Sequence, residues 1–354
     1  MILHKLRTYV GKIIRIAMGR RDGFIGTGES AALLNSRIIC SAAEKAGVAI
    51  REFPQQYFAF SHGEKTCYST SSDFSFENLL AYKMCGNKLV TATILSENGL
   101  PVPWFRGYSI DEYEQALQDF VALDRVVVVK PCFGTSSGDG ISVGVSSRSA
   151  FASAFAKTLA YSNSVLVEEF VEGENYRFTV LGGKVLTVIR RLPAYVVGNG
   201  TATIRSLIRE KNRGLADLKA ETKLLKPITI DADVARNLKR QGIKLGSVPE
   251  AGQNIQLRQV ANADQGGEIC DVTDKCHSDY IVMAAKAASL MGTSLAGTDL
   301  IAQDISAPYE EGRAVINEVN TTPALYIVRE PAADGSIDVR VGEEILNFAL
   351  NIND

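Results

Sequence analysis

The sequence has few histidines, no pattern of paired cysteines, no long apolar run and little net charge. With only three histidines, a histidine-based metal site is not expected. The six cysteines are scattered and fit no zinc or redox spacing, which predicts a protein of the reducing cytoplasm. No apolar stretch approaches the ~18–20 residues of a membrane span. The net charge of −2 favours neither nucleic acid nor an anionic membrane as a partner.

The first residues show no secretory signal, because Lys5, Arg7, Lys12 and Arg15 interrupt Leu3–Arg21. This basic segment has two interpretations. It could form an amphipathic helix that lies on a membrane. Packing on the core as a surface helix is the favoured alternative.

The remaining composition is that of a globular protein with several domains. The chain has 354 residues, of which 46% are hydrophobic and 22% charged. At roughly 100–200 residues per domain, this length predicts two or three domains. Strand and helix patterns alternate along the chain, which indicates an α/β (α+β) fold. We expect a small N-terminal α/β domain over residues 1–87, a second unit over 88–172 and a third over 173–354.

The segment Val126–Gly140 reads VVVVKPCFGTSSGDG. Its run of valines predicts a buried strand. The strand ends at Lys130, and small residues follow, among them Ser136, Ser137 and Gly138. Backbone N–H groups of such a loop can converge on phosphate oxygens, and a lysine beside it adds a positive charge. The alternative is an ordinary hairpin with a solvated lysine. Neither a Walker A sequence nor a dinucleotide fingerprint is present here.

Acidic and amide side chains lie on two predicted strands near the C-terminus, Gly297–Ile301 and Val315–Asn320. Glu318 and Asn320 are two residues apart, so they share one face of their strand. If the two strands are neighbours, Asp299, Glu318 and Asn320 present three oxygen ligands of the kind that Mg²⁺ prefers. The alternative is a polar sheet face in water. Apolar residues flank Asp299, which disfavours that alternative because a buried carboxylate needs a partner.

Taken in order, these features resemble the ATP-grasp superfamily. The resemblance runs from Lys88 through Lys130 and its loop, and through the hinge-like strand Val165–Gly173, to Leu325. Within the superfamily, the chain is most similar to the ATP-grasp module of cyanophycin synthetase and of bifunctional glutathione synthetases. The segments that carry this closer similarity are Arg190–Ala194, Gly198–Ile204, Leu257–Asn262, Gly266-Gly267 and Asp271–Asp274.

The resemblance implies a fold of two α+β subdomains that grip ATP, preceded by the small N-terminal α/β domain. Lys88 and Lys130 would hold the α- and β-phosphates, beneath a lid formed by the Gly134–Gly140 loop, which includes Ser136, Ser137 and Gly138. Glu168, with backbone groups of Glu169, Phe170 and Val171, would contact the adenine. Either Glu174 or Asn175 would contact the ribose. Asp299, Glu318 and Asn320 would bind Mg²⁺ or Mn²⁺.

The implied activity is that of an ADP-forming carboxylate–amine ligase. A carboxylate takes the γ-phosphate of ATP to give an acyl phosphate, and an amine then displaces phosphate. Arg258 is the first candidate to stabilise the developing charge, followed by Arg190 and Arg177, with Asn262 beside Arg258.

The substrates would be amino acids or peptides, and a homodimer is the commonest oligomeric state. Two alternatives remain: a kinase of the same fold, and a non-catalytic ATP-binding subunit.

Overall fold

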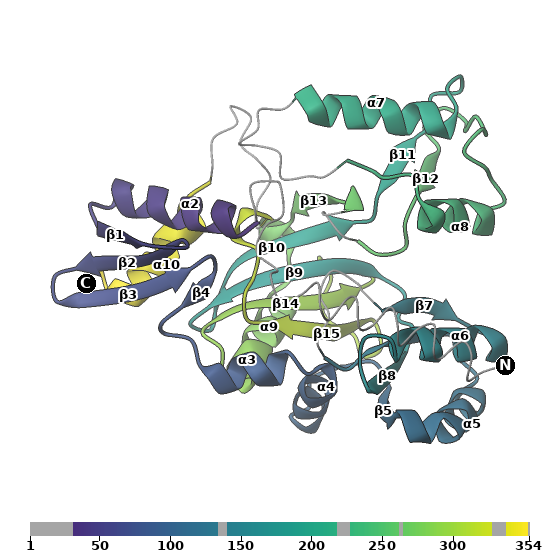
Figure 1. Cartoon of the computed structure of the whole chain (residues 1–354), viewed down its shortest axis with the longest axis horizontal. Helices are drawn as coiled ribbons and strands as arrows, with labels where there is room; N and C mark the ends of the chain where they lie inside the picture. Colours follow the sequence, from purple (N-terminus) through teal and green to yellow (C-terminus); the bar gives the residue numbers. More distant parts are fainter. Residues whose placement is uncertain (1–30, 134–139, 218–226, 262–264, 328–337, 353–354) are drawn as a thin grey trace.

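The computed structural model describes residues 31–133, 140–217, 227–261, 265–327 and 338–352 (Figure 1). The predicted basic helix within 3–21, the loop residues Ser136, Ser137 and Gly138, and Asn262 therefore lie outside the described residues. The helices are α2 (Ala31–Lys45), α3 (Leu79–Cys85), α4 (Lys88–Glu97), α5 (Tyr113–Leu123), α6 (Arg148–Thr158), α7 (Ile204–Asp217), α8 (Ala232–Arg240), α9 (Ser278–Leu290) and α10 (Arg340–Leu350).

In the described ranges, the strands form three sheets of four or five strands and one strand pair. The N-terminal sheet contains β1 (Ala49–Phe53), β2 (Tyr57–His62), β3 (Lys65–Thr70) and β4 (Asp73–Phe74), in that order. The second sheet contains β5 (Phe105–Ser109), β8 (Ser164–Glu169), β6 (Val127–Pro131) and β7 (Ser142–Val145). The central sheet contains β13 (Glu268–Asp271), β10 (Lys184–Leu192), β9 (Glu174–Leu181), β14 (Leu295–Ala302) and β15 (Ala314–Asn320). The pair contains β11 (Tyr195–Val197) and β12 (Asn254–Gln256).

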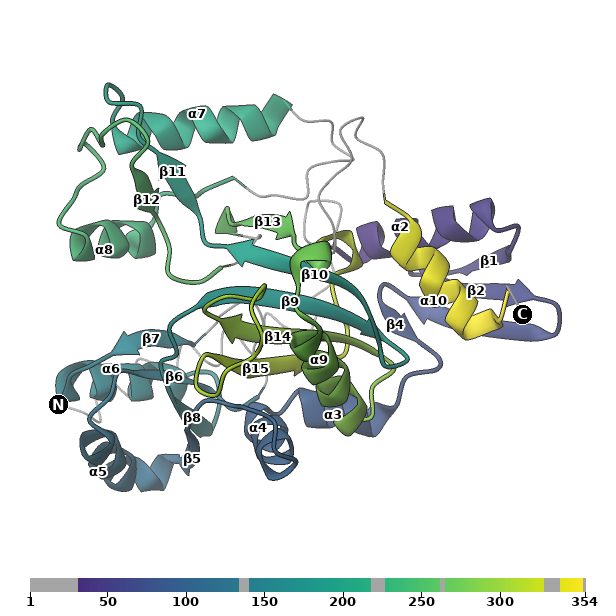
Figure 2. The ribbon, with the colours of Figure 1, turned by 180° about the vertical axis from the view of Figure 1, so that it is seen from behind.

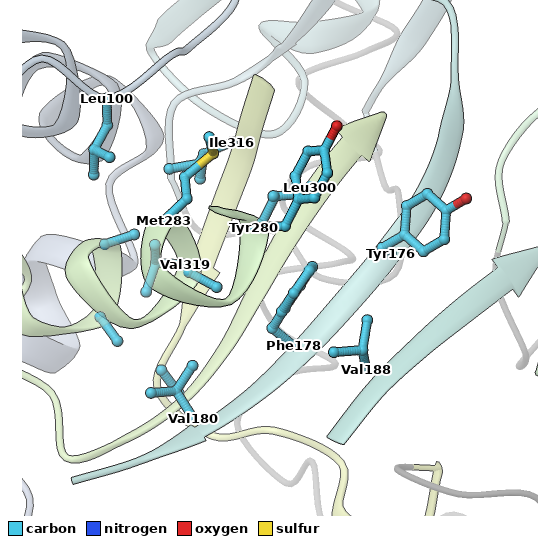
Figure 3. Close-up of a cluster of buried hydrophobic side chains, with 14 of the residues drawn as sticks. Leu100, Tyr176, Phe178, Val180, Val188, Tyr280, Met283, Leu300, Ile316 and Val319 are labelled. Atoms are coloured by element: carbon cyan, nitrogen blue, oxygen red, sulfur yellow. The ribbon is translucent and has the colours of Figure 1, made fainter. Parts of the chain in front are cut away.

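The central sheet is antiparallel throughout, and α9 covers one of its faces (Figures 1 and 2). Alternate residues of β9, namely Tyr176, Phe178 and Val180, are buried in the core beneath α9, where they meet Tyr280 and Met283 (Figure 3). Each such side chain contributes roughly 1.5–3 kcal/mol by leaving water. Because neighbouring residues of a strand point to opposite faces, the intervening residues of β9 must face the other side of the sheet.

The second sheet confirms the buried strand that the valine run predicts. Val127 and Val129 on β6 are fully buried, in a core that α5 and α6 complete. Strand β6 runs antiparallel to β8, with Val128 opposite Glu168 and Lys130 opposite Leu166. Lys130 and Glu168 are therefore diagonal neighbours on one face, a geometry that lets long side chains meet.

Helix α10, which the sequence analysis did not anticipate, packs on the N-terminal sheet together with α2. The two helices approach closely at Gly342. A Cβ atom there would lie 2.9 Å from the Cβ of Ala42 and 2.9 Å from the carbonyl oxygen of Ile38. The N-terminal sheet thus shares its core with the last described helix. The boundaries at residues 87 and 172 remain a prediction.

A side-chain cap at Asn87 separates two consecutive helices. Helix α3 ends at Cys85, and the Asn87 side chain accepts from the Val90 N–H, so α4 starts afresh at Lys88. Strand β12 is confined to Asn254–Gln256.

A separate small core lies between β11, β12, α7 and α8, at the upper end of Figure 1. No helix within the described ranges is both long enough and apolar enough to cross a membrane.

Candidate active site

A buried carboxylate with two arginines occupies the face of the central sheet opposite α9. Asp299 on β14 stands opposite Arg177 on β9 in the strand register. Arg177 donates to both carboxylate oxygens, with Nε 2.6 Å from Oδ1 and Nη2 2.7 Å from Oδ2. Arg191 on β10 places Nη2 2.9 Å from Oδ2. The Asp299 side chain is only 4% exposed, so it depends on these two arginines for its charge.

The two arginines decide the ionisation of this carboxylate. Burial by itself would raise the pKa of Asp299, but Arg177 and Arg191 outweigh burial and hold that pKa below its usual value. Burial likewise acts to lower the pKa of Arg177, yet Asp299 more than compensates and raises it. For Arg191, burial prevails and the pKa is lowered. Asp299 is therefore ionised at neutral pH, and Arg177 is its stronger partner.

A β-bulge on β15 shapes the acidic side of the site. Asp299 pairs with Glu318 but Leu300 pairs with Ile316, so Asn317 is an extra residue on β15. The bulge lets Ile316 and Val319, three residues apart, both enter the core. Glu318 lies 3.8 Å from the Lys88 Nζ.

The Asn320 amide links the acidic residues to Arg177. In one orientation of the amide, it donates to Glu318 Oε1 at 3.3 Å and accepts from Arg177 Nη2 at 3.2 Å. The structure therefore brings Asp299, Glu318 and Asn320 together, as the sequence pattern predicts.

Both candidate phosphate-binding lysines reach the same region. Lys130 Nζ lies 2.7 Å from Glu168 Oε2 and 3.5 Å from Asn317 Oδ1. The side chains of Lys130 and Glu168 are 5% and 6% exposed, so this ion pair is buried. The backbone N–H of Lys88 donates to the Cys132 carbonyl at 2.7 Å, which holds the start of α4 against the end of β6. Through Lys130 and Asn317, the second sheet and the central sheet meet at this site.

Lys88 has an unusual place in its helix. It occupies the first turn of α4, where the helix dipole disfavours a positive charge. An anion that binds at this helix N-terminus would compensate for that cost.

At the end of β8, where the chain leaves the second sheet for the central sheet, the polar groups of Glu169 and the N–H of Phe170 already have partners. The N–H groups of Glu169 and Phe170 donate to the carbonyls of Trp104 and Val126. The Glu169 carboxylate accepts from the Trp104 N–H at 3.2 Å and pairs with Arg125. These two N–H donors are thus committed to the second sheet and are not offered to a ligand in this arrangement.

The residues Glu174 and Asn175 lie on opposite faces of β9. Glu174 accepts from the Tyr176 hydroxyl at 2.7 Å and from Arg190 at 3.2 Å, on the side of α9. Asn175 stands opposite Arg191 and Ile301 in the register, so it belongs to the face that carries Asp299. Of the two ribose-contact candidates, the strand register therefore favours Asn175.

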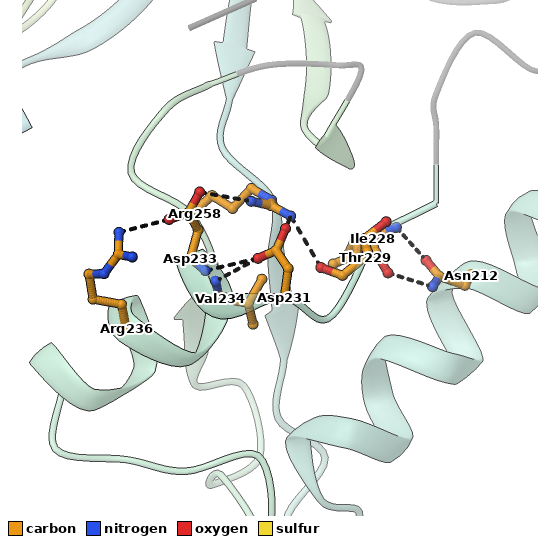
Figure 4. Close-up of polar contacts among 8 residues, drawn as sticks. All are labelled: Asn212, Ile228, Thr229, Asp231, Asp233, Val234, Arg236 and Arg258. Atoms are coloured by element: carbon orange, nitrogen blue, oxygen red, sulfur yellow. Dashed lines mark hydrogen bonds and ion pairs between the residues drawn. The ribbon is translucent and has the colours of Figure 1, made fainter. Parts of the chain in front are cut away.

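Two of the candidate catalytic arginines are engaged elsewhere. Arg258 donates to Asp231 Oδ2 at 2.6 Å and to the Thr229 carbonyl at 3.1 Å (Figure 4). Asp231 in turn caps the start of α8 by accepting from the N–H groups of Asp233 and Val234. Arg258 thus stabilises the α7–α8 unit.

Arg190 pairs with Glu174 on the α9 side of the sheet, while its neighbour Arg191 faces the site. Sequence reasoning missed Arg191 and Asn317. Strand alternation shows only that the two adjacent arginines point to opposite faces, so one of them had to face the site; it does not show which one.

The chain is similar to known proteins. Residues 94–205 match the family model described as D-ala D-ala ligase C-terminus. The chain is 33% identical over 324 residues to the glutathione biosynthesis bifunctional protein GshAB of Clostridium perfringens, covering 90% of this chain and 41% of that protein. It is 32% identical over 304 residues to cyanophycin synthetase of Trichormus variabilis, covering 84% of this chain and 33% of that protein.

A solved structure agrees with these sequence relatives. The crystal structure of a bifunctional glutathione synthetase from Pasteurella multocida aligns with a TM-score of 0.62 at 27% identity, over 90% of this chain and 44% of that one. The chain spans less than half the length of each relative named here.

Proposed function

The chain belongs to the ATP-grasp superfamily, and we propose that it is an ATP-dependent ligase that joins a carboxylate to an amine. One observation carries the proposal. The second sheet and the central sheet meet through Lys130, and around that meeting point lie a second lysine, three oxygen donors and two buried arginines. This combination of charges suits a nucleotide triphosphate with a divalent cation.

The donor set fits Mg²⁺ or Mn²⁺ in its chemistry. Asp299, Glu318 and Asn320 would hold the ion, which would neutralise the charge that develops on the transferred phosphoryl group. Among the described residues, no three His, Cys, Asp or Glu side chains gather into a metal-binding cluster, so this site depends on the asparagine amide oxygen as the third donor.

The protein side chains supply the rest of the machinery. Lys88 and Lys130 would bind the α- and β-phosphates, and Asn175 the ribose. The Gly134–Gly140 loop would exclude water that otherwise hydrolyses an activated carboxylate. Arg177 lies at the centre of the charged face, where a fixed guanidinium can stabilise the oxyanion formed when the amine attacks the acyl phosphate. Removal of one such donor typically costs about 10²–10³ in rate.

The substrates we propose are an amino acid or peptide carboxylate and an amine-bearing amino acid. This choice is supported by the names of the relatives, which act in glutathione and cyanophycin synthesis. We also propose the three-domain division at residues 87 and 172, and a homodimer as the oligomeric state.

ADP release from Mg-ATP tests the function. The protein is incubated with pools of amino acids and dipeptides, singly and in pairs, with Arg177→Met as the variant that should lose activity. ADP that forms only when a carboxylate and an amine are both present supports the ligase. ADP and a stable phosphorylated product with a single substrate would instead indicate a kinase. ATP binding without any turnover would indicate a non-catalytic subunit.

A further inference from the structure

The buried arginine pair leaves no carboxylate oxygen of Asp299 unpartnered. Arg177 engages both oxygens, and Arg191 adds a contact to Oδ2. A carboxylate that is 4% exposed and already neutralised by two guanidinium groups can hold a dication only when one of these contacts is released. If this carboxylate holds the ion of the proposed reaction, one arginine must yield its place.

The geometry distinguishes the two arginines. Arg177 stands directly opposite Asp299 in the register, makes two short hydrogen bonds, and contacts Asn320 in the amide orientation described above. Arg191 comes from β10, one strand further away, and its shortest contact with Asp299 is 2.9 Å, from Nη2 to Oδ2. Within the described residues, the buried Nε of Arg191 has no hydrogen-bond partner. Arg191 is therefore the less firmly held of the two.

We propose that Arg191 is an exchangeable counter-ion of Asp299: its guanidinium neutralises the carboxylate, and it would leave for the anionic reactants when the carboxylate holds a divalent cation. This inference rests on the proposed function, because it assumes that Asp299 is a cation ligand there. The arginine of this strand that acts at the site would then be Arg191 and not the expected candidate Arg190, whose partner Glu174 lies on the other face of the sheet. The exchange delivers a guanidinium only after the cation is in place, which orders the assembly of the site.

Binding of Mn²⁺ alone, without nucleotide or substrate, tests the exchange. The free ion is followed by electron paramagnetic resonance in the wild type, Arg191→Met and Arg190→Met. Removal of a positive charge within 3 Å of the ligand oxygen should tighten Mn²⁺ binding by at least about tenfold in Arg191→Met. Arg190→Met removes the same charge from a more exposed ion pair, so the affinity of this variant for Mn²⁺ should stay within about twofold of that of the wild type. Equal or weaker binding by Arg191→Met, or no Mn²⁺ binding by any of the three proteins, overturns the proposal.

A second measurement uses the unaltered protein and does not depend on the folding of a variant. Phenylglyoxal modifies accessible guanidinium groups, and mass spectrometry locates the modified residue. Saturating Mn²⁺ should speed the modification of Arg191 by at least about threefold and leave that of Arg177 unchanged. A rate at Arg191 that is unchanged or reduced would refute the exchange.

The two hypotheses fail separately. If Mg-ATP turns over but neither Mn²⁺ test shows the expected change, only the exchange is wrong. If Arg191→Met binds Mn²⁺ more tightly but no turnover is found, the exchange stands and the ligase activity is in question.

Discussion

The buried ion pair between Lys130 and Glu168 gives a prediction with a defined magnitude. Both side chains are about 95% shielded from water, at 5% and 6% exposure, and their charged atoms are 2.7 Å apart. Lys130→Met would leave the Glu168 carboxylate buried without its partner. Breaking such a pair typically costs about 3–5 kcal/mol. Replacing both residues with apolar ones removes the unpaired charge, so Lys130→Met/Glu168→Met should recover most of that loss.

The chain offers a reporter for this experiment. Its single tryptophan, Trp104, packs partly buried against the core of the second sheet. Its carbonyl accepts from the Glu169 N–H of β8, and its N–H donates to the Glu169 carboxylate. Trp104 fluorescence during urea unfolding therefore follows the sheet that contains the pair. The coupling energy comes from the free energies of the wild type, the two single variants and the double variant. Arg125→Met, which breaks a more exposed pair with Glu169 on the same sheet, is the control and should cost less than about 1 kcal/mol.

A coupling energy near zero would refute the reasoning. It would mean that water screens Lys130 and Glu168 despite their burial, and that the lysine is not held in a dry, preorganised position. A coupling of at least about 2 kcal/mol, with a double variant close to the wild type in stability, would support it.

Three further predictions concern other parts of the molecule. Burial, partly offset by the nearby lysines, raises the pKa of Cys132 to about 11. Iodoacetamide should therefore label this thiol slowly at pH 8. The variant Cys132→Ala should keep its rate of ADP release within about twofold of the wild type. Arg258→Met removes the guanidinium that donates to the Thr229 carbonyl and to the exposed carboxylate of Asp231, and should lower the free energy of unfolding by about 1–3 kcal/mol. Amide hydrogen exchange should become faster in α8 but not in β6. The two arginines hold the pKa of Asp299 below its usual value despite burial. The ionised carboxylate therefore contributes its full share to the free energy of unfolding above about pH 4, and this contribution is lost as the pH falls through the lowered pKa. The stability difference between wild type and Asp299→Asn should therefore shrink in urea titrations from about pH 6 to about pH 3, and a difference independent of pH would contradict the arginine pairing.

Local patterns predicted the parts of the site that depend on strand alternation. The valine run gave the buried strand β6, and the two-residue spacing placed Glu318 and Asn320 on one face. The expectation that the strand of Asp299 neighbours theirs is confirmed by the β14–β15 register. Alternation is a property of each strand by itself, which explains why one sequence suffices to reveal it.

The remaining features depend on contacts between distant segments. Which of Arg190 and Arg191 faces Asp299 is fixed by how β10 aligns with β9, and no local pattern records that alignment. The bulge at Asn317 likewise results from the fit between β14 and β15. The partner of Arg258 was not predicted for the same reason, because Asp231 lies 27 residues away along the chain. The packing of α10 on α2 joins segments about 300 residues apart.

Equilibrium binding of Mg-ATP tests the central claim most directly. Isothermal titration calorimetry is carried out with the wild type, Lys88→Met and Lys184→Met. Lys88 lies beside Glu318 at the site, whereas Lys184 is an exposed lysine that pairs with Glu344. A phosphate–lysine contact of about 1.5–3 kcal/mol predicts that Lys88→Met binds roughly 10–100-fold more weakly, with Lys184→Met unchanged. Lack of Mg-ATP binding by the wild type, or equal affinity of Lys88→Met, would contradict the claim that this charged face is a nucleotide site.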